Sequence, residues 1–209
     1  MSMMFPIEIK CPKCGTLGEA MKHNSINVSL DPGNKKKVLD RSLFDWHCEK
    51  CGATIHLEYC PLYHDMNEKY MILVTPDVET ARTEKVPVRD EYKEFMDGYK
   101  FRIVCKIDGL IEKISIFDSG LDDFAVEMLK MLLWPKLDSP KEIIFTGVAD
   151  EGIDFFVRYD DAGKNTGINV PRKYYDFCAE TVQEMKVDSS VQYVDIGVIA
   201  EIINKTDSL

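Results

Sequence analysis

Alternation of apolar and polar positions marks the first 75 residues of the chain. A period of two residues is typical of a β-strand that buries one face. The apolar sets are Phe5, Ile7 and Ile9; Ile26, Val28 and Leu30; Phe44, Trp46 and Cys48; Ile55, Leu57 and Tyr59; and residues 70–74. The turn signal at residues 31–34, DPGN, is expected to close a hairpin, with the lysine run at residues 35–37 on its solvated tip. The pattern therefore predicts an all-β segment over residues 1–75.

The period changes after a polar connector over residues 75–93, which contains Pro76 and Pro87. Residues 101–105 predict one more strand, and residues 110–117 predict a short helix. A stronger helix is predicted by apolar residues at i, i+3, i+4, i+7, i+8 and i+11, which are Leu121, Phe124, Ala125, Met128, Leu129 and Leu132. Negative charge in its first turn and Pro135 after it agree with that helix. We expect its residues Phe124, Met128 and Leu132 to pack on the β-rich segment.

The stretch from residue 137 to residue 141, with Pro140, is the best linker candidate. Beyond it, apolar residues 143–145 and 155–157 precede a turn-rich stretch at residues 160–167, so a hairpin is expected there. Pro171 suits the start of a helix that runs through Met185, and Asp195 suits the cap of another helix. The chain as a whole predicts an α+β protein with two domains, residues 1–136 and a small αβ region at residues 139–209.

Composition and charge narrow the class of protein. The 209 residues are 45% hydrophobic and 30% charged, which is the balance of a globular protein. The start MSMMFPIEIK lacks a signal peptide pattern, and no apolar run approaches the roughly 18 residues of a membrane span, so we expect a cytoplasmic protein without membrane contact. Residues 1–75 carry nine basic and nine acidic side chains, so residues 76–209 carry the whole net charge of −10. Because nucleic-acid binding needs a basic face, this distribution argues against a nucleic-acid partner.

Two cysteine pairs share one short pattern. The first is CPKCG at residues 11–15, and the second is CEKCG at residues 48–52. In a Cys-x-x-Cys turn both sulfurs can point at one ion, and the following glycine permits the tight backbone. Four thiolates in a tetrahedron are the arrangement of structural zinc, and a hairpin inserted between the pairs explains their separation of 33 residues. We expect one structural zinc ion per chain, with an iron–sulfur cluster or a thiol redox pair as alternatives. The expected ligands are Cys11, Cys14, Cys48 and Cys51.

These motifs resemble the CpXC family of prokaryotic proteins, which is named for two such cysteine motifs. The similarity spans roughly residues 7 to 135. It rests on the two pairs, on the bulky Phe44-Asp45-Trp46 ahead of the second pair, on residues 110–114 and on Leu121-Asp122-Asp123. Glu49 departs from the pattern, because proline at this position would repeat the motif. The resemblance implies metal binding and implies no particular reaction.

Several other side chains could have a chemical role, but a structural role explains each of them as well. Cys60 can act as a ligand or as a nucleophile beside His56 or His64, and a plain thiol is the alternative. His56 and Glu58 share one face of a predicted strand, and a polar exposed face explains that equally. His47 would project away from the ligand side of Cys48.

The remaining candidates lead to no catalytic assignment. Cys105 and Cys178 lie in apolar surroundings and are expected in the core. The aspartate pairs at residues 122–123 and 160–161 can be metal or acid–base carboxylates, or else helix-start charge and turn residues. We therefore expect an interaction or regulatory module with a protein partner and leave its oligomeric state open. The alternatives are a zinc ribbon that binds nucleic acid and a metal- or thiol-dependent enzyme.

Overall fold

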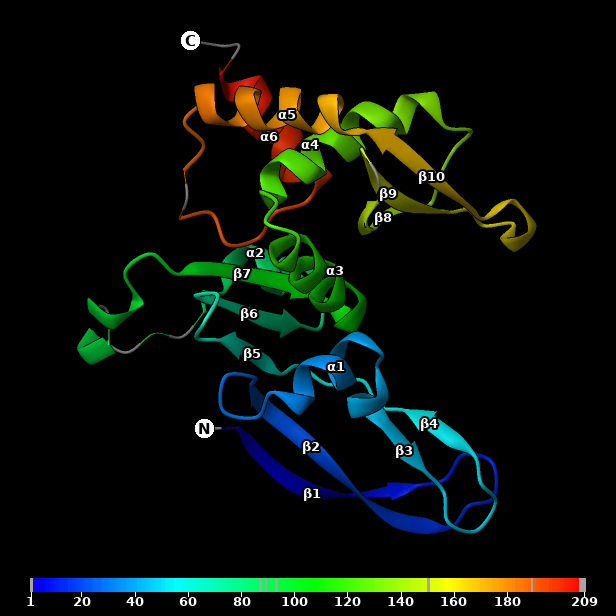
Figure 1. The fold of residues 1–209 in the computed structure, drawn as a ribbon. Helices are drawn as coiled ribbons and strands as arrows, with labels where there is room; N and C mark the ends of the chain where they lie inside the picture. The colour runs from blue at the N-terminus through cyan, green and yellow to red at the C-terminus, as the bar shows by residue number, and fades with distance from the viewer. Residues whose placement is uncertain are drawn as a thin grey trace. The chain divides into compact units, whose positions relative to one another are not determined.

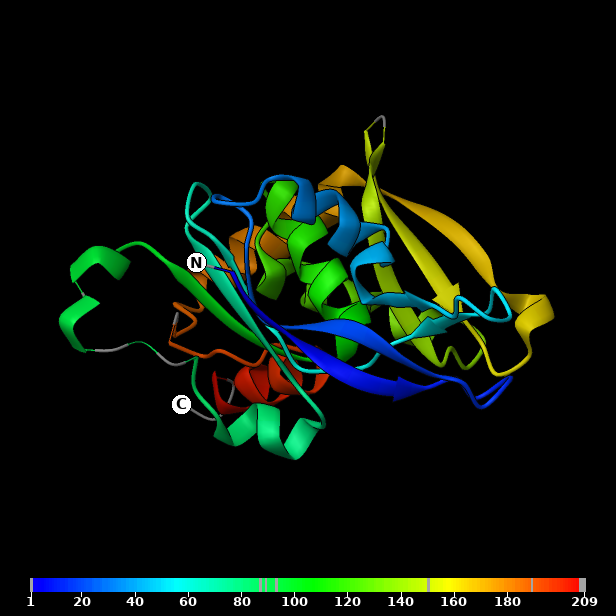
Figure 2. The same cartoon turned by 90° about the horizontal axis from the view of Figure 1, so that it is seen from below.

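The computed structural model describes residues 2–86, 88, 90–92, 94–149, 151–188 and 190–206. It contains helices and sheets in an α+β arrangement, which confirms the predicted fold class (Figures 1 and 2). Two compact units divide the chain, Met1–Ile111 and Glu112–Leu209, and the division falls inside helix α3 (Lys106–Asp118). The two domains expected at residues 1–136 and 139–209 stay a prediction.

The first unit contains a five-stranded sheet and a separate two-stranded hairpin. The sheet has the order β1-β2-β5-β6-β7. Its strands are β1 (Met3–Lys10), β2 (Leu17–Asn27), β5 (Leu62–Asp65), β6 (Tyr70–Thr75) and β7 (Lys100–Cys105). The β1–β2 and β5–β6 pairs are antiparallel, whereas β2–β5 and β6–β7 are parallel. The hairpin pairs β3 (Asp45–His47) with β4 (Thr54–His56).

One face of the five-stranded sheet forms the core of this unit. Ile26, Tyr63 and Ile72 are cross-strand neighbours on β2, β5 and β6, and all three are fully buried. The Tyr63 ring stacks on Tyr70 with centroids 5.9 Å apart. Burying each such side chain contributes about 1.5–3 kcal/mol, so this row anchors the sheet. The strands predicted at residues 70–74 and 101–105 are confirmed.

The expectation that residues 1–75 are all β is wrong from Val28 to Phe44, because β2 ends at Asn27 and two helices follow. The DPGN signal closes no hairpin; Pro32 is instead the N-cap residue of helix α1 (Gly33–Leu39), which contains the lysine run. Proline fits the start of a helix as well as a turn, and fully buried Val38 fixes the helix on the core. The short helix η1 (Ser42–Phe44) follows.

The predicted connector also contains regular structure. Helix α2 (Val78–Thr83) is capped by Asp77, whose carboxylate accepts a hydrogen bond from the Thr80 N–H at 2.7 Å. The short helices η2 (Asp90–Tyr92) and η3 (Glu94–Met96) follow. Pro87, named in the connector prediction, lies outside the described residues.

Strands β1 and β2 extend past the rest of their sheet as a two-stranded ribbon. β1 pairs with β2 along its length, whereas β2 pairs with β5 only from Ser25 to Asn27. Over residues 17–21, β2 therefore has β1 as its only strand neighbour in the described part of the chain. The ribbon is the long blue hairpin of Figures 1 and 2, and the first cysteine pair lies in the loop that joins its strands.

The second unit combines an antiparallel sheet of order β10-β9-β8 with helices. Its strands are β8 (Glu142–Ala149), β9 (Gly152–Arg158) and β10 (Thr166–Pro171), and its further helices are α4 (Asp123–Leu133), η4 (Trp134–Lys136), η5 (Ala162–Lys164), α5 (Arg172–Glu184) and α6 (Ile196–Thr206). The hairpin predicted at residues 160–167 is confirmed. Pro171 directly precedes α5, and Asp195 accepts a hydrogen bond from the N–H of Val198 at 2.8 Å, so both helix starts were predicted correctly.

The strong helix predicted from its apolar spacing is α4, but its packing was predicted wrongly. Phe124 and Met128 lie in one buried cluster with Phe145 and Phe155 of the β8–β9 hairpin, and Leu132 is 39% exposed. Apolar spacing identifies the buried face of a helix and does not identify what covers it. No helix of the described chain is long and apolar enough to cross a bilayer.

Charged side chains are buried between α3 and α4. The Lys113 ammonium lies 3.0 Å from the Asp123 carboxylate and 3.4 Å from Glu127. The Lys130 ammonium lies 2.7 Å from Glu112 and 3.0 Å from Glu127. Burial lowers the pKa of Lys130, but Glu127 and Glu112 outweigh it, and the net pKa lies above the usual value. Lys130 therefore stays charged at neutral pH.

Candidate metal centre

The two cysteine pairs adopt the same backbone structure. In each, the N–H of the first cysteine donates to the carbonyl five residues on, at 2.8 Å for Cys11 and 2.9 Å for Cys48. The N–H of the following glycine donates back to the carbonyl of that first cysteine, at 2.8 Å in both pairs. Gly15 and Gly52 have φ angles of 72° and 67°, in the left-handed region that glycine occupies without strain. The glycines therefore permit the tight turns that the sequence predicted.

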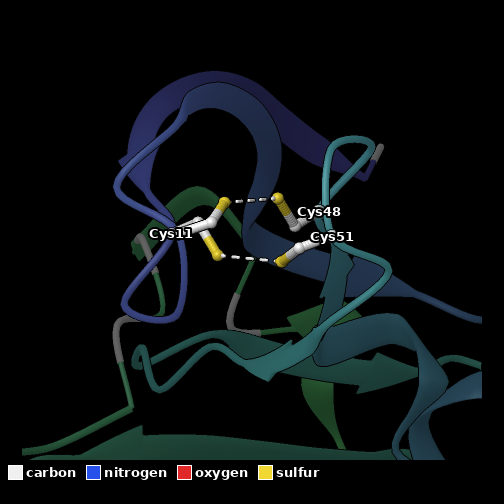
Figure 3. A group of neighbouring side chains, drawn as sticks. Cys11, Cys48 and Cys51 are labelled. Carbon is white, nitrogen blue, oxygen red and sulfur yellow. Dashed lines mark hydrogen bonds between the residues drawn. The ribbon is translucent and has the colours of Figure 1, made fainter.

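The turns bring four sulfur atoms together (Figure 3). The Cys11 and Cys51 sulfurs lie 3.7 Å apart, the Cys14 and Cys48 sulfurs lie 3.6 Å apart, and all four lie within 4.8 Å of one another. A tetrahedral ion with metal–sulfur bonds of about 2.3 Å places its ligands about 3.8 Å apart. A disulfide would need about 2.05 Å, and all these cysteines are free thiols. The four cysteines can thus hold one metal ion.

The thiols differ in how easily they lose a proton. Hydrogen bonds with the side chain and backbone of Thr16 lower the pKa of Cys14 to about 6. A backbone hydrogen bond from Ala53 lowers the pKa of Cys51, but burial and hydrogen bonds with neighbouring thiols raise it to about 11. Only thiolates bind metal strongly. A metal ion must therefore displace a proton from Cys51, whereas Cys14 is already largely a thiolate at neutral pH.

The second cysteine pair is attached to the ribbon by Trp46, two residues before Cys48. The indole N–H donates to the Glu19 carbonyl at 2.9 Å. The ring lies over Gly18, where an added Cβ would stand 2.5 Å from the nearest ring carbon. A glycine inside a strand often marks such a close approach, and this signal in β2 could have revealed the contact from the sequence.

The neighbouring histidines make other contacts. His47 Nδ1 lies 3.0 Å from Thr54 Oγ1 across the β3–β4 pair, and His47 is outside the cluster of close ligand atoms. His56 is exposed, and its Nδ1 lies 2.5 Å from an oxygen of Asp45. Strand β4 ends at His56, so Glu58 lies outside the strand that was predicted to include it, but both side chains line a cavity of about 60 Å³ together with the first residues of α3.

The other cysteines stand apart from the cluster. Cys60 is exposed, and partial burial of its sulfur raises its pKa, so it is a poor nucleophile at neutral pH. Cys178 is buried, and burial raises its pKa to about 11, as expected of a core thiol. Cys105, which was also expected in the core, is only half-buried. His64 Nε2 lies 3.3 Å from the Tyr99 hydroxyl.

The two aspartate pairs have structural roles. Asp122 caps α4 by accepting a hydrogen bond from the N–H three residues on, at 3.1 Å. Asp123 belongs to the buried ion pairs with Lys113. Asp160 pairs with an exposed lysine at 3.0 Å, and Asp161 accepts a hydrogen bond within its own turn at 3.0 Å.

Comparison with known proteins identifies one similarity. A family model described as CpXC protein matches residues 9–130, a segment that covers more than half of the chain and includes both cysteine pairs. No curated protein and no solved structure matches the chain.

Proposed function

The chain belongs to the CpXC family, and we propose that its four N-terminal cysteines bind one zinc ion with a structural role. The single observation that carries this proposal is the sulfur cluster, with separations of 3.6 and 3.7 Å that match two edges of a tetrahedron of zinc–sulfur bonds. A set of four soft sulfur ligands suits zinc better than calcium, magnesium or manganese. The proposed ligands are Cys11, Cys14, Cys48 and Cys51.

The proposed ion stabilises the fold around two hairpins. One knuckle ends the β1–β2 ribbon and the other joins β3 to β4, so one ion would link both hairpins. An isolated two-stranded hairpin is marginally stable in water. Zinc binding releases about 10–16 kcal/mol in small domains that fold around the metal, and part of that free energy would stabilise this region.

A closed site also limits the activity of the protein. Four cysteines fill a tetrahedron and leave no position for a substrate or an activated water, unlike the three-ligand sites of zinc hydrolases. We therefore propose that the zinc ribbon serves an interaction or regulatory module that binds another protein in the cytoplasm, where reduced cysteines persist. The lysine run suits nucleic acid poorly, because Lys35 is paired with Asp65 at 3.1 Å.

Metal content by mass spectrometry tests the proposed site. The wild-type chain and Cys60→Ser, the exposed control, should each hold one zinc per chain, whereas Cys48→Ser and Cys51→Ser should hold none. Iron with inorganic sulfide would identify a cluster instead, and a Cys48→Ser chain that keeps its zinc would contradict the ligand set.

Fluorescence tests the structural role. In a Trp134→Phe background, Trp46 reports on the contact with Gly18 beside the second knuckle. Chelation should shift the Trp46 emission and melt the hairpins, because the metal-free thiols no longer hold the two knuckles together. A metal-free chain with unchanged emission and unchanged stability would show that the ion has no structural role.

A further inference from the structure

One face of the β1–β2 ribbon is exposed from the Pro6–Met21 pair to its tip, whereas His23, the partner of Met4 on the same face, is buried. Register places Pro6 opposite Met21, Glu8 opposite Glu19, and Lys10 opposite Leu17. These six side chains and Met4, two residues before Pro6, all point to the same side and are all exposed. We call them the outer ribbon face. The opposite side carries buried Ala20 and the contact between Gly18 and Trp46.

The outer ribbon face is rich in apolar surface. Met4, Met21 and Leu17 are 56%, 42% and 59% exposed, and Pro6 lies beside the two methionines. Met4, Pro6 and Met21 form one exposed apolar patch, with Leu17 beyond the next residue pair, and such a patch on a folded protein commonly marks a binding surface. Methionine side chains are flexible and polarizable, so they adapt to the shape of a partner.

An acidic pair lies in the middle of this apolar face. Glu8 and Glu19 are direct cross-strand neighbours, an arrangement in which like charges repel. Neither carboxylate has an ion-pair partner among the described residues. Lys10 follows on the same face, but its side chain leans toward the first knuckle, with Cε 3.9 Å from the Cβ position of Gly15. A cation from outside the chain would therefore relieve the repulsion.

We propose that the outer ribbon face binds an extended segment of another protein that alternates apolar and basic side chains. The apolar residues would cover Met4, Met21 and Leu17, and a lysine or arginine between them would lie over Glu8 and Glu19. This inference rests on the proposed interaction role and names the surface and partner chemistry for it. Pro6 lacks an N–H group on the edge strand, which favours docking on the face over addition of a further strand.

A second copy of the chain is a poorer occupant than such a segment. Each copy would bring its own Glu8 and Glu19 toward the same pair of the other copy. A basic segment gains from the same charges, both in steering toward the surface and in contact with it.

Peptide binding tests the proposal with the zinc-loaded full chain. The probe is a labelled peptide of alternating leucine and lysine of about ten residues, which matches the length of the ribbon. Fluorescence anisotropy should detect binding of this peptide, and much weaker binding of alternating leucine–glutamate and serine–lysine peptides. Glu8→Gln with Glu19→Gln should weaken binding about fivefold, and Met4→Gln with Met21→Gln about tenfold. Val148→Gln with Glu151→Gln, an exposed pair in the second unit, should leave it unchanged.

Three results would overturn the proposal. The first is a wild-type chain that does not bind the leucine–lysine peptide. The second is a control variant that weakens peptide binding as much as the outer-face variants do, which would indicate general charge attraction. The third is a dimer of the wild-type chain that the outer-face variants abolish, because a second copy of the chain would then occupy the outer ribbon face. Zinc content is measured in every variant. A wild-type chain without zinc would contradict the proposed metal role, whereas a zinc-loaded wild-type chain that does not bind the peptide would contradict only the proposed docking surface.

Discussion

Gly18→Ala should weaken the contact that joins the second knuckle to the ribbon. An alanine Cβ would stand 2.5 Å from a ring carbon of Trp46, whereas ordinary contact begins at 3.4 Å. The ring must then move by about 1 Å, which costs about 1–3 kcal/mol of packing energy. The same movement strains the hydrogen bond from the indole N–H to Glu19, now 2.9 Å long, which is worth about 1 kcal/mol.

Part of this cost is offset, because alanine suits a strand better than glycine by about 0.5–1 kcal/mol. The net effect should be a loss of about 1–3 kcal/mol from the free energy of unfolding of the first unit. Since the metal-free hairpins can relax the strain, zinc affinity should also fall, by about tenfold or more.

The assay is urea unfolding followed by Trp46 fluorescence in a Trp134→Phe background, with a chelator competition for zinc affinity. Gly33→Ala is the matched control, because no atom lies within 4 Å of its added Cβ and its backbone needs no glycine. Gly18→Ala with the stability, Trp46 emission and zinc affinity of the parent chain would refute the proposed contact.

Three further predictions concern charge. Lys130→Met leaves partly buried Glu112 without its ammonium and leaves buried Glu127 with only that of Lys113, so it should cost about 3–5 kcal/mol of unfolding free energy. Lys141→Met at the surface should cost less than about 1 kcal/mol, and similar losses would contradict the network. Burial of His23, and to a smaller extent the charge of Lys37, lowers its pKa in the folded chain below the usual 6.5. Between that folded pKa and 6.5 the unfolded chain binds more protons than the folded chain, so the free energy of unfolding should fall as the pH drops through this range. In saturating zinc, His23→Gln should lose less stability over that range than wild type, and equal pH slopes would contradict this. Binding of labelled DNA or RNA should be weak and vanish at physiological salt, and a tight complex that Lys35→Glu abolishes would refute the charge argument.

The sequence predicted best those features that depend on local pattern. The spacing of apolar residues identified α4, and the turn-rich stretch at residues 160–167 identified the β9–β10 hairpin, because period and turn chemistry act over a few neighbouring residues. The cysteine motifs likewise predicted the sulfur cluster, since each Cys-x-x-Cys-Gly turn positions its own two sulfurs.

Features that depend on distant partners were missed or wrong. The DPGN signal permits a turn or a helix start, and the burial of Val38 decides between them. Phe124 and Met128 were predicted to pack on the N-terminal β segment but lie in a cluster with β8 and β9, because the apolar face of a helix does not identify the element that covers it. Asp123 looked like helix-start charge but lies buried beside Lys113, ten residues earlier in the chain, and no periodic pattern signals that pairing.

X-ray absorption at the zinc edge tests the central claim most directly. The claim is that four thiolates hold one zinc ion and fill its coordination. The purified chain should give a single shell of four sulfur atoms at about 2.3 Å, with no nitrogen or oxygen ligand. A shell that contains nitrogen or oxygen, or a zinc-free chain whose cysteines are paired as disulfides, would contradict it.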